Sequence, residues 1–489
     1  MLEKLAKQTA IYGISTIIGR FLSYLLTPYY TRVFGQAEYG IITDIYALIP
    51  FALVVLTMGM ESGYFRFAAK AAAAGGDVEA AKKRLFSTVW GITSLAAVAF
   101  FAAVAALREP IARAMGEAYV AHPEYVVLVG AIVMFDVASC IPFSRLREQG
   151  RAGRFVTLKM LNIVLQTGLA FAFGAMGLFA TEFGVGWAFV ANLAASVITF
   201  ASILPTTNRT VPKIDWLLLA TVFSYSLPLL VSGVAGPANE FIDRQMIKYL
   251  VPENAMAQLG IYGAITKIAV VMMLFTQMYR LAAEPFFLAN YRKDDFKAMN
   301  AAALKYYIIA SMLIFLGIAL FKDLFALIVG RDFRQGIFIL PVVLGANVLS
   351  GVWLNLSFWY KREERTWLAI AVTFVGLIFT VLCNVALVPK YGYYGAAWAR
   401  LASEAAMVAV SYWLNRRYYP TPYPMARIVE YVAVALVVYG ASVAGERAIA
   451  QVAVQYVLNA LLVGSYALYV VRREKIDVAA MVRSILRRG

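Results

Sequence analysis

Residues 88–107 read TVWGITSLAAVAFFAAVAAL, an apolar run that no charged residue interrupts. A helix of about 20 residues, rising 1.5 Å per residue, spans the ~30 Å hydrocarbon core of a bilayer. A membrane β-strand would instead need about ten residues of alternating polarity. Neither this run nor 431-YVAVALVVYGASVAG-445 alternates in that way. Both runs therefore predict membrane-spanning α-helices.

The composition of the whole chain is that of a membrane protein. Hydrophobic residues make up 62% of its 489 residues and charged residues only 15%, whereas soluble domains carry roughly 25% charged residues. The net charge of +16 would suggest nucleic-acid binding in a soluble protein. Cytoplasmic loops of membrane proteins are also rich in Lys and Arg, so we expect no nucleic-acid partner here.

Fourteen apolar segments are candidate membrane spans, joined by short connections with no inserted soluble domain. They lie near 9–31, 41–63, 86–107, 124–143, 155–178, 183–204, 216–240, 256–281, 303–321, 336–358, 366–387, 391–414, 427–446 and 450–471. One set of alternating loops, together with the termini, holds 31 basic residues and the opposite set holds 10. Because cytoplasmic segments carry the excess of Lys and Arg, this bias predicts that both termini are cytoplasmic.

The sequence offers little for enzymatic chemistry. Cys140 and Cys383 both lie in apolar segments, and the single histidine, His122, lies on a predicted outer loop. These residues have neither disulfide nor metal-site spacing. No acidic pair has catalytic spacing, and the longest outer connection, near 108–123, is short for a membrane glycan polymerase or ligase. We therefore expect no metal, no cofactor and no enzymatic activity.

Three segments recur later in the chain in the same order, which indicates an internal duplication. Residues 12–47 resemble 225–269, 145-RLREQGR-151 resembles 360-YKREERT-366, and 183–196 resemble 392–405. We predict an N-lobe of spans 1–6 (1–207), a C-lobe of spans 7–12 (208–420), and two further spans with a basic tail (421–489). Six spans per repeat predict a pseudo-twofold axis along the membrane normal, an arrangement in which transporters bind substrate between the repeats.

The run 28-PYYTRVFGQAEYGIIT-43 resembles the N-terminal pattern of the polysaccharide transporters, the Wzx-like oligosaccharide flippases of the MOP superfamily. Three later features agree with this resemblance: the Arg-rich loop after span 4, the Ser-x-Pro at 226–228 with Asp243 and Arg244 beyond it, and 391-YGYYGAAWA-399. The similarity covers almost the whole chain.

The resemblance implies an all-α MOP fold of two six-helix lobes around a central cavity lined by spans 1, 2, 7 and 8. It implies alternating-access transport of an undecaprenyl-diphosphate-linked oligosaccharide, such as an O-antigen, capsule or exopolysaccharide unit. The cargo would move from the cytoplasmic to the periplasmic leaflet of a bacterial inner membrane. The implied partners are this lipid-linked oligosaccharide, membrane lipids and polysaccharide polymerase machinery. Lipid II flippases and MATE drug exporters share the fold, so both remain alternatives.

Three basic residues fall inside predicted spans: Arg20, Lys267 and Arg400. An ionisable group at such depth costs about 2.5–3.5 kcal/mol on insertion scales and by default suggests a functional site. A diphosphate crossing the apolar region needs such cations. We therefore predict that these three residues line the substrate cavity. For Arg400 an intrahelical pair with Glu404, one turn later, is an equal alternative.

Several further charged residues are candidates for ion coupling or gating. Transport against a gradient needs an ion-binding carboxylate, and four are candidates by depth: Asp44, Asp136, Glu240 and Glu404. Glu240 and Asp243 lie beside Arg244, where a salt bridge of the closed state is an equal alternative. Glu61 and Arg66 lie near the predicted cytoplasmic end of the span at 41–63, and we expect them to form a gate. Arg280 lies near the cytoplasmic end of the span at 256–281, and we expect its side chain to extend to the membrane interface.

Overall fold

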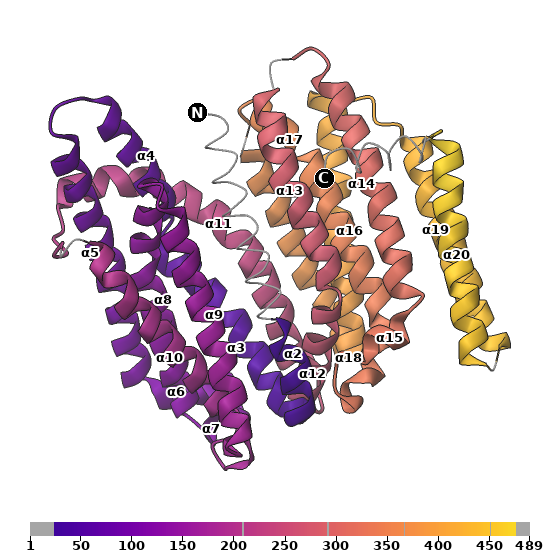
Figure 1. Cartoon of the computed structure of the whole chain (residues 1–489), viewed down its shortest axis with the longest axis horizontal. Coiled ribbons are helices and arrows are strands. Elements are labelled where there is room, and N and C mark those ends of the chain that lie inside the picture. The colour runs from indigo at the N-terminus through magenta and orange to yellow at the C-terminus, as the bar shows by residue number, and fades with distance from the viewer. Residues whose placement is uncertain (1–23, 208–209, 291–292, 366, 450, 476–489) are drawn as a thin grey trace. The chain divides into compact units, whose positions relative to one another are not determined.

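The computed structural model describes residues 24–207, 210–290, 293–365, 367–449 and 451–475. Every regular element in these ranges is helical and none is a strand, so the predicted all-α class is confirmed. The chain divides into two compact units, Met1–Gly263 and Ala264–Gly489. Figure 1 shows their helices in order along the chain. Arg20 and most of the first predicted span lie outside the described residues.

The first unit contains the helices from α2 to the beginning of α12. They are α2 (Leu26–Val33), α3 (Gln36–Thr57), α4 (Met60–Ala73), α5 (Val78–Ala106), α6 (Arg108–Met115), α7 (Glu117–Val120), α8 (Glu124–Glu148), α9 (Ala152–Ala175), α10 (Gly186–Ile203), α11 (Trp216–Leu250) and the first residues of α12 (Ala255–Ile268). Within this unit α8 packs against α5 and α10, α10 packs against α9, and α11 packs along α3 and α4.

The second unit contains the end of α12 and all later helices. They are α13 (Val270–Ala289), α14 (Phe296–Ala319), α15 (Lys322–Ala326), α16 (Leu340–Leu356), α17 (Phe358–Arg362), α18 (Trp367–Tyr418), α19 (Met425–Ala448) and α20 (Val452–Arg473). Short 3₁₀ helices span Leu178–Ala180, Leu204–Thr207 and Arg331–Ile339. In this unit α16 packs against α18, α14 and α13, while the pair α19 and α20 packs against α14 (Figure 1).

The helices account for most of the fourteen predicted spans. The first predicted span lies mostly outside the described residues, and at 216–240 only the shorter segment Trp216–Leu230 is apolar. Within the described ranges, ten helical segments are long and apolar enough to cross a membrane, and an interrupted pair, Ala255–Ile268 and Val270–Glu284, forms an eleventh. One of the ten, α18, is 52 residues long and contains a non-helical residue, Gly392 (φ 56°, ψ −138°). This glycine separates the two spans predicted at 366–387 and 391–414. Multi-pass membrane topology is therefore confirmed.

Helix α11 explains why the first compact unit extends beyond the predicted N-lobe. The Asp215 side chain caps it by accepting a hydrogen bond from the Leu218 backbone N–H (3.1 Å). The helix then continues through Pro228 and Pro237 to Leu250. Prolines are tolerated in membrane helices because neighbouring groups satisfy the freed carbonyls. The predicted lobe boundary at 207/208 follows the sequence repeat and remains a prediction, whereas the compact units divide after Gly263.

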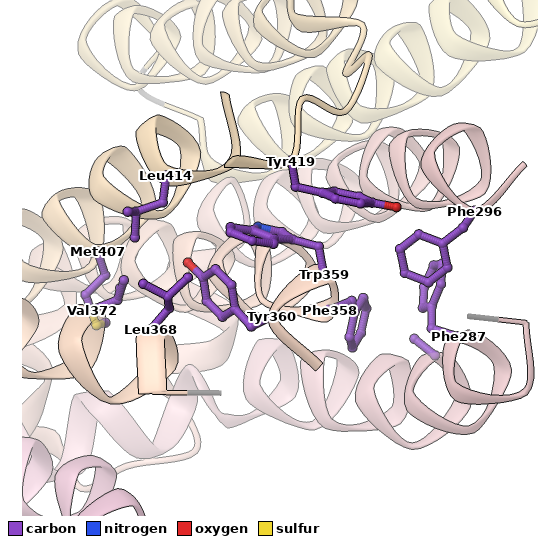
Figure 2. Packing of buried hydrophobic residues seen from close by; sticks show 11 residues of the cluster. Phe287, Phe296, Phe358, Trp359, Tyr360, Leu368, Val372, Met407, Leu414 and Tyr419 are labelled. Carbon is purple, nitrogen blue, oxygen red and sulfur yellow. The ribbon is translucent and has the colours of Figure 1, made fainter. Parts of the chain in front are cut away.

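An aromatic core closes one end of the second unit, where α13, α14, α17 and α18 meet (Figure 2). Trp359 and Tyr419 stack with ring centroids 5.7 Å apart and an interplanar angle of 5°. Phe287 lies against Phe358, with ring centroids 4.7 Å apart. Burial of such large rings contributes much of the packing energy where these helices meet.

Candidate functional site

A buried ion pair joins α3 and α11 inside the first unit. Lys248 Nζ lies 2.5 Å from Asp44 Oδ2, and their side chains are only 5% and 1% exposed. Tyr119 of α7 donates a hydrogen bond to the same carboxylate oxygen (2.6 Å), and Gln245 of α11 donates to Asp44 Oδ1 (2.5 Å). We call these four residues, Asp44, Tyr119, Gln245 and Lys248, the Asp44 network. It satisfies both carboxylate oxygens and so offsets the cost of burying the two charges.

Tyr119 is held in its neutral, donating form. Burial raises the pKa of its phenol well above the ordinary value, and the adjacent Asp44 carboxylate raises that pKa further. The Lys248 ammonium lies 4.6 Å from the centre of the Tyr119 ring, within the range of a cation–π contact. The short helix α7 is therefore held against α3 and α11 by polar contacts.

Glycines bring α3 and α12 into backbone contact next to the Asp44 network. A Cβ on Gly40 would lie 2.0 Å from the Met256 carbonyl oxygen, and one on Gly260 would lie 2.0 Å from that of Gln36. A Cβ on Gly263 would meet the Thr43 hydroxyl at 2.2 Å. Such distances leave no room for a methyl group, so only glycine permits this approach.

The other predicted gating residues of α11 lie at the same end of the helix. Arg244 Nη2 pairs with Glu240 Oε1 one turn earlier (2.8 Å), and Tyr262 of α12 donates to Asp243 Oδ2 (2.5 Å). The Glu240 side chain is 60% exposed while that of Arg244 is 7% exposed. Glu240 and Arg244 are therefore paired within one helix, and Asp243 ties α11 to α12.

At the opposite end of α3 and α4, the expected gating residues have separate partners. Glu61 Oε1 lies 2.6 Å from Arg147 Nη1 of α8. The Arg66 guanidinium lies over the Tyr225 ring of α11, 4.1 Å from its centroid. Glu61 thus holds α4 to α8, and Arg66 holds α4 to α11. Asp136, deeper in α8, accepts a hydrogen bond from Ser196 of α10 (2.8 Å).

In the second unit, Arg400 and Lys267 lie near the interruption between α12 and α13. Arg400 Nη2 donates to Asn347 Oδ1 (3.2 Å), and Asn347 Nδ2 donates to the carbonyl oxygen of Ala269 (3.3 Å). Ala269 is the residue at which the helix is interrupted, and its carbonyl oxygen also accepts a hydrogen bond from the Met272 backbone N–H (3.2 Å). Asn347 is therefore a second donor to the carbonyl at the break. Lys267 is half-buried in the last turn of α12. Lys267 is thus close to the break in sequence, and Arg400 is linked to it through Asn347.

Glu404 lies one turn beyond Arg400 on α18. Its Oε2 atom is buried and accepts no hydrogen bond from any residue that the structure describes. Buried carboxylate oxygens are normally satisfied, so this oxygen is an exception that is able to accept a proton or a cation. Arg280 Nε lies 3.5 Å from Glu284 Oε1, and Lys361 Nζ lies 2.6 Å from the same oxygen.

No group of three or more His, Cys, Asp or Glu side chains within the described ranges could hold a metal ion.

The sequence interpretation missed Tyr119, Gln245, Lys248, Arg147 and Asn347. One signal pointed to Lys248: it follows Glu240 and Arg244 at intervals of four residues, which places all three on one face of α11. The other four residues act through contacts between distant segments, which spacing does not encode.

A family model described as "Polysaccharide biosynthesis protein" matches residues 5–288. The chain belongs to this family. Over 285 residues it is 23% identical to the "Probable low-salt glycan biosynthesis flippase Agl15" of Haloferax volcanii. That alignment covers 57% of this chain and spans 58% of the relative's length. The predicted family is therefore confirmed.

Solved structures of transporters share the fold. A lipid II flippase MurJ in an inward closed conformation superposes with a TM-score of 0.77 at 13% identity, covering 96% of this chain and 100% of MurJ. An inward-facing MATE multidrug transporter of the MOP superfamily superposes with a TM-score of 0.67 at 15% identity, covering 82% of this chain and 94% of that transporter. At these identities the likeness establishes the MOP fold alone.

Proposed function

We propose that this protein is a flippase that moves a lipid-linked oligosaccharide across the membrane by alternating access. The Asp44 network carries the proposal. It joins α3 and α11, which belong to opposite halves of the predicted repeat, through a buried ion pair. Apolar residues of similar volume would often be as stabilising as a buried ion pair, so stability alone does not explain the charges. When the helices separate, both charges regain water, and this hydration offsets the lost contacts.

Membership of the family supports a glycan as cargo, and the three predicted intramembrane cations support a cargo that carries a diphosphate. Members of this family act in polysaccharide biosynthesis, and the Haloferax volcanii relative is named as a glycan biosynthesis flippase. We propose an undecaprenyl-diphosphate-linked O-antigen, capsule or exopolysaccharide unit, moved outward across a bacterial inner membrane with both termini cytoplasmic. Arg20, Lys267 and Arg400 would neutralise its diphosphate, because an anion in hydrocarbon is very costly without a counter-charge.

We assign ion coupling to Glu404. Among the deeply placed carboxylates, Asp44 and Asp136 both accept hydrogen bonds from neighbours, whereas Glu404 Oε2 accepts none from the described residues. Glu404 Oε2 can therefore take up a proton or a sodium ion without first losing a hydrogen bond. This property suits reversible binding of the coupling ion. Arg400, one turn away, would transmit the change in charge to Asn347 and the break at Ala269.

Mass spectrometry of polyprenyl-linked lipids in a strain that lacks this gene tests the function. The proposal predicts accumulation of an undecaprenyl-diphosphate oligosaccharide and loss of the surface polysaccharide, both reversed by the wild-type gene. An unchanged lipid pool with intact surface glycan would reject the proposal and favour export of a small molecule. Accumulation of the peptidoglycan precursor would instead identify a lipid II flippase.

A further inference from the structure

The two halves of the repeat contain equivalent turns. In the first, the Arg151 N–H donates to the Leu146 carbonyl (2.9 Å), and in the second the Arg365 N–H donates to the Tyr360 carbonyl (2.8 Å). These bonds align Arg147 with Lys361. Each of these cations pairs at 2.6 Å with a glutamate from an earlier helix, Glu61 in the first half and Glu284 in the second.

The equivalent turns differ at the residue with left-handed backbone conformation. In the first turn this residue is Gly150, with φ of 68°, and in the second it is Glu364, with φ of 54°. Glycine is the residue that adopts this conformation without strain at the end of a helix. Glu364 is therefore the less stable choice for the backbone, and non-glycine residues in this conformation occur more often at functional sites.

The Glu364 side chain lines a cavity of about 200 Å³. One part of the lining is apolar and consists of Phe287, Phe296 and Phe358, which lie together at one end of the aromatic core (Figure 2). The rest is charged, because Glu284, Lys361 and Arg362 line the cavity with Glu364. This volume lies below the ~300–1,000 Å³ of pockets for drug-sized ligands, so the cavity suits a small polar group and not a whole oligosaccharide.

The charges of the cavity are unevenly satisfied. Lys361 is paired with Glu284, whereas Arg362 donates a hydrogen bond to the Tyr419 hydroxyl and its guanidinium lies 4.9 Å from the centre of the Phe296 ring. The exposed Glu364 side chain forms no ion pair with any residue that the structure describes. The cavity therefore offers one available carboxylate beside phenyl rings, which together attract an ammonium group. Lys361 and Arg362 lie beside it as donors to an anion.

The cavity lies at the membrane boundary. Its charged residues lie at the ends of membrane spans: Glu284 ends the apolar segment Val270–Glu284, and Lys361 and Arg362 end the span Arg331–Arg362. Glu364 lies in the loop between that span and α18. The headgroup region of the bilayer lies at this depth. A headgroup that carries both a phosphate and an ammonium group would contact Lys361 and Arg362 through the phosphate and Glu364 through the ammonium.

We propose that this cavity is a binding site for a zwitterionic phospholipid headgroup with a primary ammonium, such as phosphoethanolamine. The ammonium pairs with Glu364 against the phenylalanine rings, and the phosphate accepts hydrogen bonds from Lys361 and Arg362. This assignment goes beyond the proposed transport function and does not depend on it.

Native mass spectrometry of the full-length protein, exchanged into defined phospholipid mixtures, tests the site. The wild-type protein should retain phosphatidylethanolamine about tenfold over phosphatidylglycerol, because a hydrogen-bonded charged pair contributes enough free energy for that preference. Glu364→Gln should abolish the preference. The matched control Glu363→Gln removes the same charge from the neighbouring exposed residue, which does not line the cavity, and should retain it. The proposal would be overturned if Glu364→Gln and Glu363→Gln showed the same preference for phosphatidylethanolamine.

Two further arms separate the site from structural effects and from other ligands. Glu364→Gly should lose phosphatidylethanolamine while its melting temperature stays level or rises, because glycine relieves the backbone. Loss of lipid together with a lower melting temperature would mean that Glu364 is structural and would overturn the proposal. Deacylated glycerophosphoethanolamine should compete only weakly with phosphatidylethanolamine if the site binds a lipid. It should compete as well as the lipid itself if the site binds a free headgroup. Binding of a monosaccharide without any lipid preference would identify a sugar site instead and overturn the assignment.

Discussion

Lys248 Nζ of α11 lies 2.5 Å from Asp44 Oδ2 of α3, and both side chains are almost completely buried. The two residues are separated by most of the first compact unit in sequence. Their contact shows that the beginning of α3 and the end of α11 form one polar interface, with α7 added through Tyr119. In the proposed cycle, this interface separates when the cargo leaves.

Lys248→Met removes one partner of the buried pair and leaves the Asp44 carboxylate buried without its counter-charge. We expect a loss of about 3–5 kcal/mol in unfolding free energy, measured by thermal unfolding in detergent. The double variant Asp44→Leu with Lys248→Met should recover most of this stability, yet transport should fall because the interface no longer gains hydration on opening. Arg113→Met is the control, since it breaks an ion pair with Glu109 in which both side chains are largely exposed. A single Lys248 variant as stable as this control would contradict the account.

Gly260→Ala should separate α3 from α12, because the new methyl group would lie 2.0 Å from the Gln36 carbonyl oxygen. We expect lower stability and a gap between the helices, detected as faster reaction of a cysteine introduced at Met256 with a water-soluble thiol reagent. Gly168→Ala in α9 is the matched control, because its Cβ meets nothing within 4 Å. That control should gain helix propensity of up to ~1 kcal/mol. Similar reactivity in both variants would argue against a glycine-dependent closure.

Glu404→Gln keeps the shape of the side chain and removes its ability to take up a proton or pair with a cation. We expect normal folding, because its Oε2 atom receives no hydrogen bond from the described residues that the substitution could break. Transport should become insensitive to an imposed proton or sodium gradient. The measurement is the initial transport rate in proteoliposomes with and without each gradient. Gradient dependence equal to that of the wild type would exclude Glu404 as the coupling residue.

Asp215 predicts a pH dependence of stability at the beginning of α11. Hydrogen bonds from the Leu218 backbone N–H and from Arg84 hold the pKa of this carboxyl below its ordinary value of 3.8. Because the pKa is lower in the folded state, the stabilisation is present above the unfolded pKa and is lost as pH falls through the folded pKa. The melting temperature of Asp215→Asn should therefore lie below that of the wild type at pH 6 and approach it at the lowest pH. A constant difference at all pH values would contradict this assignment.

Lys267→Ala and Arg20→Ala should leave expression and melting temperature near the wild-type values but reduce transport. Each removes a cation that we expect to neutralise the diphosphate of the cargo. The readout is the surface polysaccharide formed by each variant in the deletion strain. Lys83→Ala, at an exposed position of α5, is a control for the loss of a basic residue unconnected with the cavity. Normal surface glycan in both cavity variants would remove Arg20 and Lys267 from the site.

Composition and run length were sufficient to predict the helices. The run at 88–107 became part of α5, and the sequence 391-YGYYGAAWA-399 contains Gly392, at which two spans meet. The segments 145–151 and 360–366 resemble each other in sequence, and each contains a turn closed by an equivalent hydrogen bond. The length of each apolar run and the positions of the glycines determine these features, and both are visible in the sequence.

The polar contacts were less predictable. Lys248 falls in the predicted outer connection between the spans at 216–240 and 256–281, yet it is buried because Asp44, Tyr119 and Gln245 surround it. Glu61 was expected to act with Arg66, its neighbour on the same helix, but its ion pair is with Arg147 from α8. Each of these contacts depends on how distant helices pack, and spacing within one helix carries no information about that packing.

The most direct test of the central claim is a flipping assay with the purified protein in proteoliposomes. A polyprenyl-diphosphate oligosaccharide is placed in the inner leaflet, and a glycosidase that cannot cross the membrane reports its arrival in the outer leaflet. The account predicts rapid, protein-dependent cleavage of the glycan that is slowed in Lys248→Met and in Lys267→Ala. Folded wild-type protein that leaves the glycan as well protected as protein-free vesicles do would contradict the account.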